Sequence, residues 1–238
     1  MSLLATIKQV VFIPIHPKGR IIIAVAAIIA ILLFQINDFF GFVGVVLLGF
    51  CTFFFRNPDR TCPQSVGAIL STGDGVVSNI SRASAPKELG MDMSVEYNKI
   101  SIFLNVFNVH VNRVPVGGRI VKQHYIAGKF LNADLDKASE DNERNIMAVE
   151  NEAGETIIFT QIAGFVARRI IVSEKKEGDF VEQGERYGII RFGSRCDIYV
   201  PLHYDLMVSK GQIAIGGETI LAVDKTKFSL EDLRWKKL

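Results

Sequence analysis

The sequence has little charge and few cysteines. Only 22% of its 238 residues are charged, and 27 basic against 25 acidic side chains leave a formal net charge of +2. No strong electrostatic field therefore argues for binding to nucleic acid. The three cysteines, Cys51, Cys62 and Cys196, show neither CxxC spacing nor the count of a disulfide-rich scaffold, so we expect a reducing compartment.

Several catalytic motifs are also absent. The sequence contains no GxxxxGK followed by Ser or Thr, no HExxH, no GxSxG and no paired CxxC. The sequence therefore gives no local evidence that the chain is a P-loop, zincin, α/β-hydrolase or zinc-ribbon protein. The four histidines are His16, His110, His124 and His203, and none forms an HxH pair. We expect no metal, and a tethered metallopeptidase is a poorly supported alternative that bound zinc would revive.

Hydrophobic residues reach 49%, and the surplus lies in two apolar runs, 21–34 and 39–55. As helices these runs would be roughly 21 to 26 Å long, slightly under the ~30 Å hydrocarbon core of a bilayer. Asn37 and Asp38 between them are typical turn residues. We therefore predict a membrane-anchoring helical hairpin over residues 21–55, with one long tilted span as the alternative. We interpret residues 1–20 as an interfacial segment, a plain connector being equally open.

Basic residues flank both ends of this apolar region: Lys8, Lys18 and Arg20 before it, and Arg56 and Arg60 after it. Under the positive-inside tendency, a hairpin leaves the N-terminus and the whole of residues 56–238 on the cytoplasmic side of the cell (inner) membrane. A cleaved signal peptide fits poorly, because the first apolar run continues into the second without a small-residue cleavage site.

From residue 56 onward the sequence consists of short β-rich runs bounded by turn residues. These runs are 100–107, 156–163, 169–172, 187–192 and 197–200, and only 132–145 has a clearly non-strand composition. The sequence therefore predicts a mostly β domain with minor α structure.

A faint repeat relates residues 177–185 to residues 210–218. Each segment has two glycines six residues apart, and the second glycine is followed by Glu. The glycines are Gly178 and Gly184 in the first segment and Gly211 and Gly217 in the second. Paired turns of this kind are typical of a barrel-sandwich hybrid of the biotinyl or lipoyl type. Two ordinary glycine-bearing hairpins are the alternative. Neither turn carries the solitary lysine that a swinging-arm carrier needs.

The dipeptide Gly193-Ser194 is expected about once by composition alone, so its presence proves nothing. Its setting is more informative, because it lies between the strand-like runs 187–192 and 197–200. A tight turn there would present the Gly193 carbonyl to the Ser194 hydroxyl.

The segment GERYGIIRFGSRCDIYVP, residues 184–201, resembles the processing segment of the phosphatidylserine decarboxylases, in which a Gly-Ser bond breaks itself. Other blocks follow in family order: FFRNPDR (54–60), STGDGVV (71–77), FLNVFNVHVNRVPVGG (103–118), HYIAGKFLNADLDKASEDNERN (124–145) and QIAGFVARRI (161–170). The likeness runs from residue 54 to roughly residue 222. The chain is similar to the compact prokaryotic form of that family.

The resemblance implies a self-processing enzyme. Ser194 Oγ would attack the Gly193 carbonyl, the resulting ester would eliminate, and hydrolysis would leave a covalent pyruvoyl group and ammonia. The chain would become a heterodimer of residues 1–193 (the beta chain) and 194–238 (the alpha chain). The pyruvoyl ketone would form a Schiff base with the substrate amine and replace PLP as electron sink. Phosphatidylserine would thus yield phosphatidylethanolamine, a step of phospholipid biosynthesis, with neither PLP nor metal.

The resemblance also implies two catalytic partners for Ser194. Asp74 matches the acidic residue that helps to activate the serine, although many members read SPADG where this chain reads STGDG. A surface turn aspartate is the alternative. His110, five residues before Pro115, matches a candidate general acid that returns the proton to the substrate carbon. An isolated histidine beside a strand is otherwise usually structural.

One position departs from the family pattern. Many longer members have a second histidine for self-cleavage where this chain has Arg113, and an arginine cannot act as the base. The base is therefore open between His110 and another residue such as His124. Arg113, Arg191 and Arg195 are candidates to pair with the lipid phosphate or carboxylate, but we expect solvated surface positions for them.

The best alternative from another class is a non-catalytic, membrane-tethered barrel-sandwich adaptor. An intact-mass measurement separates the two hypotheses, because the enzyme would appear as two fragments and the adaptor as one chain. The expected partners of the enzyme are phosphatidylserine, the lipid bilayer and its own two fragments, and a homo-oligomer is also possible.

Overall fold

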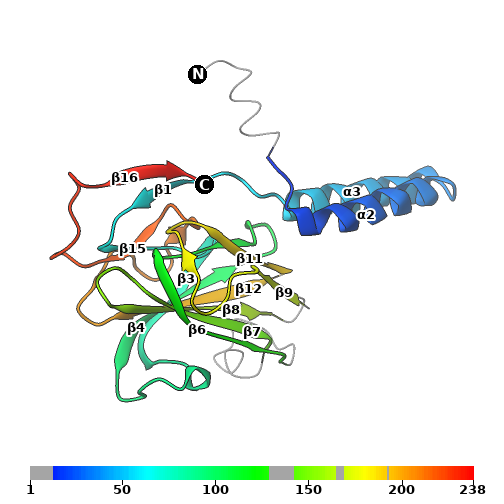
Figure 1. The fold of residues 1–238 in the computed structure, drawn as a ribbon. Coiled ribbons are helices and arrows are strands. Elements are labelled where there is room, and N and C mark those ends of the chain that lie inside the picture. The colour runs from blue at the N-terminus through cyan, green and yellow to red at the C-terminus, as the bar shows by residue number, and fades with distance from the viewer. Residues whose placement is uncertain (1–12, 129–141, 165–168, 192) are drawn as a thin grey trace. The chain divides into compact units, whose positions relative to one another are not determined.

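The computed structural model describes residues 13–128, 142–164, 169–191 and 193–238. The chain forms two compact units, Met1–Pro58 and Asp59–Leu238, which are described separately below (Figure 1). The described elements of the first unit are helices, and those of the second are strands and one 3-10 turn.

The helical unit contains the 3-10 turn η1 (Pro17–Gly19) and the helices α2 (Arg20–Phe34) and α3 (Asp38–Phe54), which lie side by side (Figure 1). Asn37 begins α3, because its side-chain oxygen accepts a hydrogen bond from Phe40 N–H at 3.0 Å. Glycine allows the helices to pack closely: a Cβ at Gly44 would lie 2.7 Å from Ala30 Cα. The chain therefore forms two helices joined by a short turn, rather than one long helix.

Among the described helices, the stretch Pro17–Phe34 is long and apolar enough to cross a membrane, whereas Asp38–Phe54 is apolar but shorter. The apolar N-terminal helix supports association with a membrane. Of the predicted interfacial segment 1–20, residues 1–12 lie outside the described residues.

The strand unit folds into four sheets that curl into a half-barrel (Figure 1). It also contains the 3-10 turn η2 (Lys87–Leu89). The strands are β1 (Thr61–Gln64), β2 (Ala68–Leu70), β3 (Gly75–Ser84), β4 (Glu96–Leu104), β5 (Val111–Arg113), β6 (Gly118–Ile126), β7 (Arg144–Glu150), β8 (Thr156–Ala163), β9 (Arg169–Val172), β10 (Phe180–Val181), β11 (Arg186–Arg191), β12 (Ser194–Pro201), β13 (Asp205–Leu206), β14 (Ile213–Ala214), β15 (Ile220–Val223) and β16 (Arg234–Lys237).

The largest sheet has eight strands in the order β10-β6-β7-β8-β12-β4-β3-β14. The smaller sheets are β1-β16, β5-β11-β9 and β13-β15-β2. Strand β12 is central, since it pairs antiparallel with β8 on one side and β4 on the other. The mostly β fold predicted from the sequence is confirmed.

The two faces of strand β12 belong to different hydrophobic clusters, because successive side chains of a strand point to opposite faces. Cys196, Ile198 and Val200 belong to the main core, and Tyr199 belongs to a second cluster with Leu89 of η2. Ser194 lies an even number of residues from Cys196, Ile198 and Val200, so its side chain points to the same face of the sheet, towards the main core.

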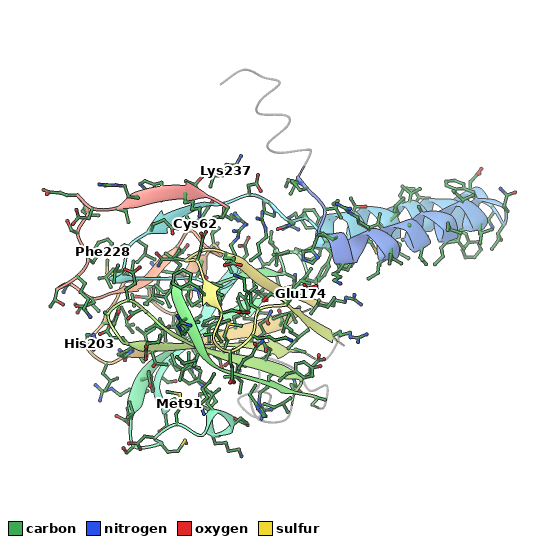
Figure 2. The ribbon with its side chains drawn as sticks, in the orientation of Figure 1. Cys62, Met91, Glu174, His203, Phe228 and Lys237 are labelled. Atoms are coloured by element: carbon green, nitrogen blue, oxygen red, sulfur yellow. The ribbon has the colours of Figure 1, made fainter. Side chains whose placement is uncertain are left out.

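The faint sequence repeat corresponds to two segments of the same structure, 177–185 and 210–218, each a turn, a two-residue strand and a second turn. The four glycines have positive φ angles of 93°, 83°, 91° and 78° at Gly178, Gly184, Gly211 and Gly217, a region that favours glycine. Strand β10 in the first repeat and strand β14 in the second form the opposite edges of the largest sheet. Both second glycines approach Cys62 (labelled in Figure 2), whose sulfur would lie 2.5 Å from a Cβ at Gly184.

Strands β8 and β9 have the predicted bounds, but two predictions were wrong in part. The strand predicted over 100–107 ends at Leu104, because Asn105 and Asn108 fold the chain into a turn through side-chain bonds to backbone N–H groups, each 2.9 Å long. In the stretch 132–145, predicted not to be a strand, Arg144 and Asn145 belong to β7. Residues 129–141 lie outside the described residues.

Replacement of a core aromatic residue tests this packing. Phe159 is 0% exposed and its ring stands edge-to-face against Tyr187, with 5.0 Å between the ring centroids. We expect Phe159→Ala to lower the free energy of unfolding by about 3–5 kcal/mol, measured by urea titration in detergent. Phe180→Ala is the matched control, because Phe180 is 55% exposed. Equal stability of the two variants would contradict the packing described.

Candidate active site

Ser194 is the first residue of β12 and lies between Leu104 of β4 and Ala163 of β8. Its side chain is completely buried, and within the described part of the chain its Oγ has no hydrogen-bond partner. Gly193, directly before Ser194, has a φ of +65°, which favours glycine. A Cβ there would meet nothing within 4 Å, so the backbone angle rather than space makes glycine suitable.

The residue before Ser194 is held on both its polar backbone groups. The carbonyl oxygen of Gly193 accepts a hydrogen bond from Gly164 N–H at 3.1 Å. The N–H of Gly193 donates to His110 Nε2 at 3.3 Å. A fixed N–H donor on a carbonyl oxygen stabilises the negative charge that develops when a nucleophile attacks that carbonyl.

His110 lies directly before β5 and is completely buried. Its Nδ1 lies 3.0 Å from the carbonyl oxygen of Asn108. Because a carbonyl oxygen only accepts, these hydrogen bonds assign the proton to Nδ1 and leave a lone pair on Nε2, where Gly193 N–H donates. The ring is therefore a neutral imidazole with its basic nitrogen beside the Gly193-Ser194 bond.

Asp74 lies in the loop before β3. Its Oδ2 is 2.6 Å from Arg60 Nη2, and its Oδ1 accepts a hydrogen bond from Gly216 N–H at 2.9 Å. A second carboxylate, that of Glu218, lies 3.9 Å from Arg60. The structure thus brings His110, Gly193 and Gly164 together by hydrogen bonds, whereas these two bonds of Asp74 connect it to Arg60 and Gly216.

The three arginines named from the sequence differ in their surroundings. Arg113 is 3% exposed and donates to the main-chain oxygens of Gly184 and Leu238 at 2.8 and 3.1 Å. Burial lowers the pKa of Arg113 to about 10, so it stays protonated at neutral pH. Arg195 is 4% exposed and paired with Asp197. The predicted solvated positions were therefore wrong for both.

Arg191, the third arginine, is partly exposed and lies directly opposite Arg169 across the β9–β11 pair. Burial and the neighbouring Arg169 charge lower its pKa. This position is two residues before Gly193.

His124, the other candidate base, is exposed on β6. Strands β7 and β8 lie between β6 and β12, which separates His124 from β12 by roughly 14 Å at about 4.8 Å per strand. His124 is also aligned with Ile146, Thr160 and Asp197, not with the start of β12. Of the two candidate bases, only His110 lies at the Gly193-Ser194 bond.

Gly164 was missed as a functional residue by the sequence reasoning, although it lies in the quoted block QIAGFVARRI. Its contribution is a backbone N–H, which any residue except proline provides. The only sequence signal is therefore a glycine directly after the strand run 156–163.

A separate cluster has the spacing of a metal site. One ligand atom each from Glu155, His203 and Asp224 lies within 4.8 Å of the others; His203 is labelled in Figure 2. Lys227 Nζ, however, lies 3.0 Å from Glu155 Oε1 and 3.1 Å from Asp224 Oδ2. An ammonium group thus takes the position that a cation would need. Glu155 directly precedes the first residue of β8, whereas Ser194 pairs with Ala163, the last residue of β8. The cluster and Ser194 therefore lie at opposite ends of β8.

This cluster predicts a pH dependence of stability. Hydrogen bonds from Thr226 and Lys227 lower the pKa of Asp224 from 3.8 to about 2. Its stabilising contribution is therefore fully present above pH 3.8 and is lost as the pH falls towards about 2. We expect Asp224→Asn to lower Tm at neutral pH, with a difference from the wild type that shrinks over this window in circular dichroism melts.

Asp205→Asn is the matched control for that series. Asp205 pairs with Lys225 at 3.0 Å, but both side chains are largely exposed, so its effect should be small at every pH. A Tm difference for Asp224→Asn that stays constant from pH 7 to pH 2 would contradict the assignment.

Known proteins resemble this chain over most of its length. The family model for phosphatidylserine decarboxylase matches residues 47–222. A phosphatidylserine decarboxylase proenzyme of Rickettsia akari (strain Hartford) is 52% identical over 208 residues, which cover 87% of this chain and 89% of that protein. The proenzyme of Rickettsia felis has the same identity and coverage, and that of Rickettsia typhi is 51% identical. The chain belongs to the phosphatidylserine decarboxylase family.

Proposed function

We propose that this chain is a self-processing, pyruvoyl-dependent enzyme that converts phosphatidylserine to phosphatidylethanolamine. Membership of the family supports decarboxylation of phosphatidylserine, and the relatives are named proenzymes. The observation that carries the finer proposal is the setting of the Gly193-Ser194 bond. Gly164 N–H binds its carbonyl oxygen, His110 Nε2 lies at the neighbouring N–H, and the Ser194 hydroxyl is buried beside them.

Cleavage begins in this proposal with a proton transfer from Ser194 Oγ to His110 Nε2, which exchanges its bond to Gly193 N–H for the hydroxyl. Oγ then bonds to the Gly193 carbonyl carbon while the negative charge develops on the oxygen that Gly164 N–H binds. The Gly193-Ser194 C–N bond breaks, and the proton passes to the released nitrogen of Ser194, which leaves the two parts joined by an ester at Oγ. Loss of the Ser194 Cα proton and departure of the Gly193 carboxylate would then cut the chain, and addition of water with release of ammonia would leave the pyruvoyl group. Asp74 supports this step by holding its loop through Arg60 and Gly216.

The surroundings of Ser194 fit a prosthetic group formed in place. A pyruvoyl group at residue 194 supplies a ketone that reacts with the substrate amine and accepts electrons as carbon dioxide leaves. Residue 194 is held between β4 and β8 by its pairing with Leu104 and Ala163. His110 Nε2 then holds the proton that returns to the substrate carbon.

The cleaved product would consist of residues 1–193 and 194–238, joined by the pairing of β12 with β8 and β4. Helices α2 and α3 would anchor residues 56–238 on the cytoplasmic side of the inner membrane, where the lipid substrate resides. The apolar helix and the basic residues that flank the helices support this placement. Family membership disfavours a non-catalytic adaptor.

Removal of the nucleophile tests self-cleavage. We expect Ser194→Ala to remain a single chain of 26.4 kDa, because no hydroxyl is left to attack the Gly193 carbonyl. Wild-type protein should give two masses in denaturing mass spectrometry. Ser209→Ala, at an exposed serine of the same fragment, should process like the wild type. Cleavage of Ser194→Ala at this bond would refute the proposal.

The identity of the base is tested with a pair of histidine variants. His110→Gln should slow cleavage by roughly 10²- to 10⁴-fold, because it removes the basic nitrogen at the bond. His124→Gln should cleave at the wild-type rate, since His124 lies three strands away. The fraction of intact chain is followed by mass against time after synthesis. Normal cleavage of His110→Gln, or a block in His124→Gln, would reverse the assignment.

A further inference from the structure

Side-chain amides from four strands form a directional chain of hydrogen bonds through the strand unit. Gln123 Nε2 donates to Asn145 Oδ1 at 3.4 Å, Asn145 Nδ2 donates to Gln161 Oε1 at 3.1 Å, and Gln161 Nε2 donates to Asn112 Oδ1 at 2.8 Å. Every amide donates in the same direction, from β6 through β7 and β8 to β5. Successive bonds of this kind polarise one another, so the last amide becomes a stronger donor.

The chain ends at Asn112 Nδ2, which has no acceptor within the described residues. Asn112 is 0% exposed, so bulk water does not satisfy this group. A buried amide without a partner is costly, and such groups in proteins call for an explanation by a ligand or by function. An NH₂ group can only donate, so its partner must be an acceptor such as a carbonyl oxygen.

Asn112 Nδ2 lies on the side of the sheet to which Ser194 points. Residues aligned across an antiparallel pair share a face, and Leu104 is aligned with Ser194. Asn112 Nδ2 and Leu104 Cδ2 both lie beside Gly73, since a Cβ added there would be 3.1 Å from the first and 3.2 Å from the second. The neighbouring donor Gln161 is aligned with Cys196, on the same face as Ser194.

The position of Asn112 along its strand supports the same placement. Asn112 lies in β5, two residues after His110, which directly precedes that strand. His110 contacts Gly193 on one side of residue 194. Asn112 Nδ2 and Leu104, the register partner of residue 194, both lie beside Gly73.

We propose that Asn112 Nδ2 donates a hydrogen bond to the carbonyl oxygen of the group formed from Ser194, and thereby orients and polarises that carbonyl. This inference rests on the proposed function, because the carbonyl exists only after cleavage. The new group stays attached to β12 beside Leu104, and is thus held next to the terminal donor of the amide chain. The unpaired donor of the precursor gains its acceptor in the processed enzyme.

The test measures the carbonyl itself, without substrate. Purified protein is made with serine labelled at Cα with carbon-13, and its reaction with hydroxylamine is followed by mass. Asn112→Leu should cleave into the same two fragments but form the oxime roughly three- to tenfold more slowly, as expected for loss of one hydrogen bond. Its labelled carbonyl resonance should move upfield, because a hydrogen bond deshields the carbonyl carbon.

Thr72→Val is the matched control. The Thr72 hydroxyl is also buried and has no hydrogen-bond partner by geometry among the described residues, but it is not part of the amide chain. This variant should keep the wild-type oxime rate and resonance. An equal slowing in both variants would overturn the inference, because a general disturbance of the site would then explain it.

The outcomes separate this inference from the proposed function. Absence of any trappable carbonyl in the wild type would end the proposed function. Equal rates and resonances in the wild type and Asn112→Leu would overturn the role of Asn112 alone. If Asn112→Leu does not fold, Asn112→Ala removes the same donor with a smaller side chain. Folded variants that both fail to cleave would also overturn the inference, because Asn112 would then serve cleavage itself.

Discussion

The start of strand β12 is the constraint on which the rest of this molecule depends. Residue 194 is held by two neighbouring strands, whereas residue 193 belongs to a turn with positive φ. The bond between them therefore joins a residue within a strand to a residue outside it. The hydrogen bonds from Gly193 to His110 and from Gly164 to Gly193 are both on the turn side of this bond, so in the proposed mechanism both residues would act there.

This arrangement also explains how a cut chain would stay folded. Strand β12 supplies a central strand and its core side chains, so residues 194–238 are built into the main sheet. Tyr204 and Lys227 add contacts across the cut, since both bind Glu155, at 2.8 and 3.0 Å. Breaking one peptide bond at a strand end removes none of these interactions, so reactivity at residue 194 does not compete with stability.

The sequence predicted the elements with a strong local pattern and could not predict partners far apart in the chain. Strands 156–163 and 169–172 were correct because apolar β-rich runs end at turn residues, and the paired glycines of the repeat mark real turns. The burial of Arg113 was missed, because its partner Gly184 lies 71 residues further along the chain. The burial of Arg195 was missed although its partner Asp197 is only two residues away, because the sequence does not show that both faces of β12 are buried. Gly164 acts through its backbone, which sequence does not distinguish.

Arg113, which departs from the family pattern, binds main-chain oxygens, and of the two candidate bases it is His110 that lies at the bond. The proposed function requires that Ser194 is converted to a pyruvoyl group. The mass of the small fragment of wild-type protein tests this most directly. We predict a fragment of residues 194–238 that is lighter by one ammonia than the peptide beginning with serine, whereas an intact chain, or a fragment with an unchanged serine, would contradict the account.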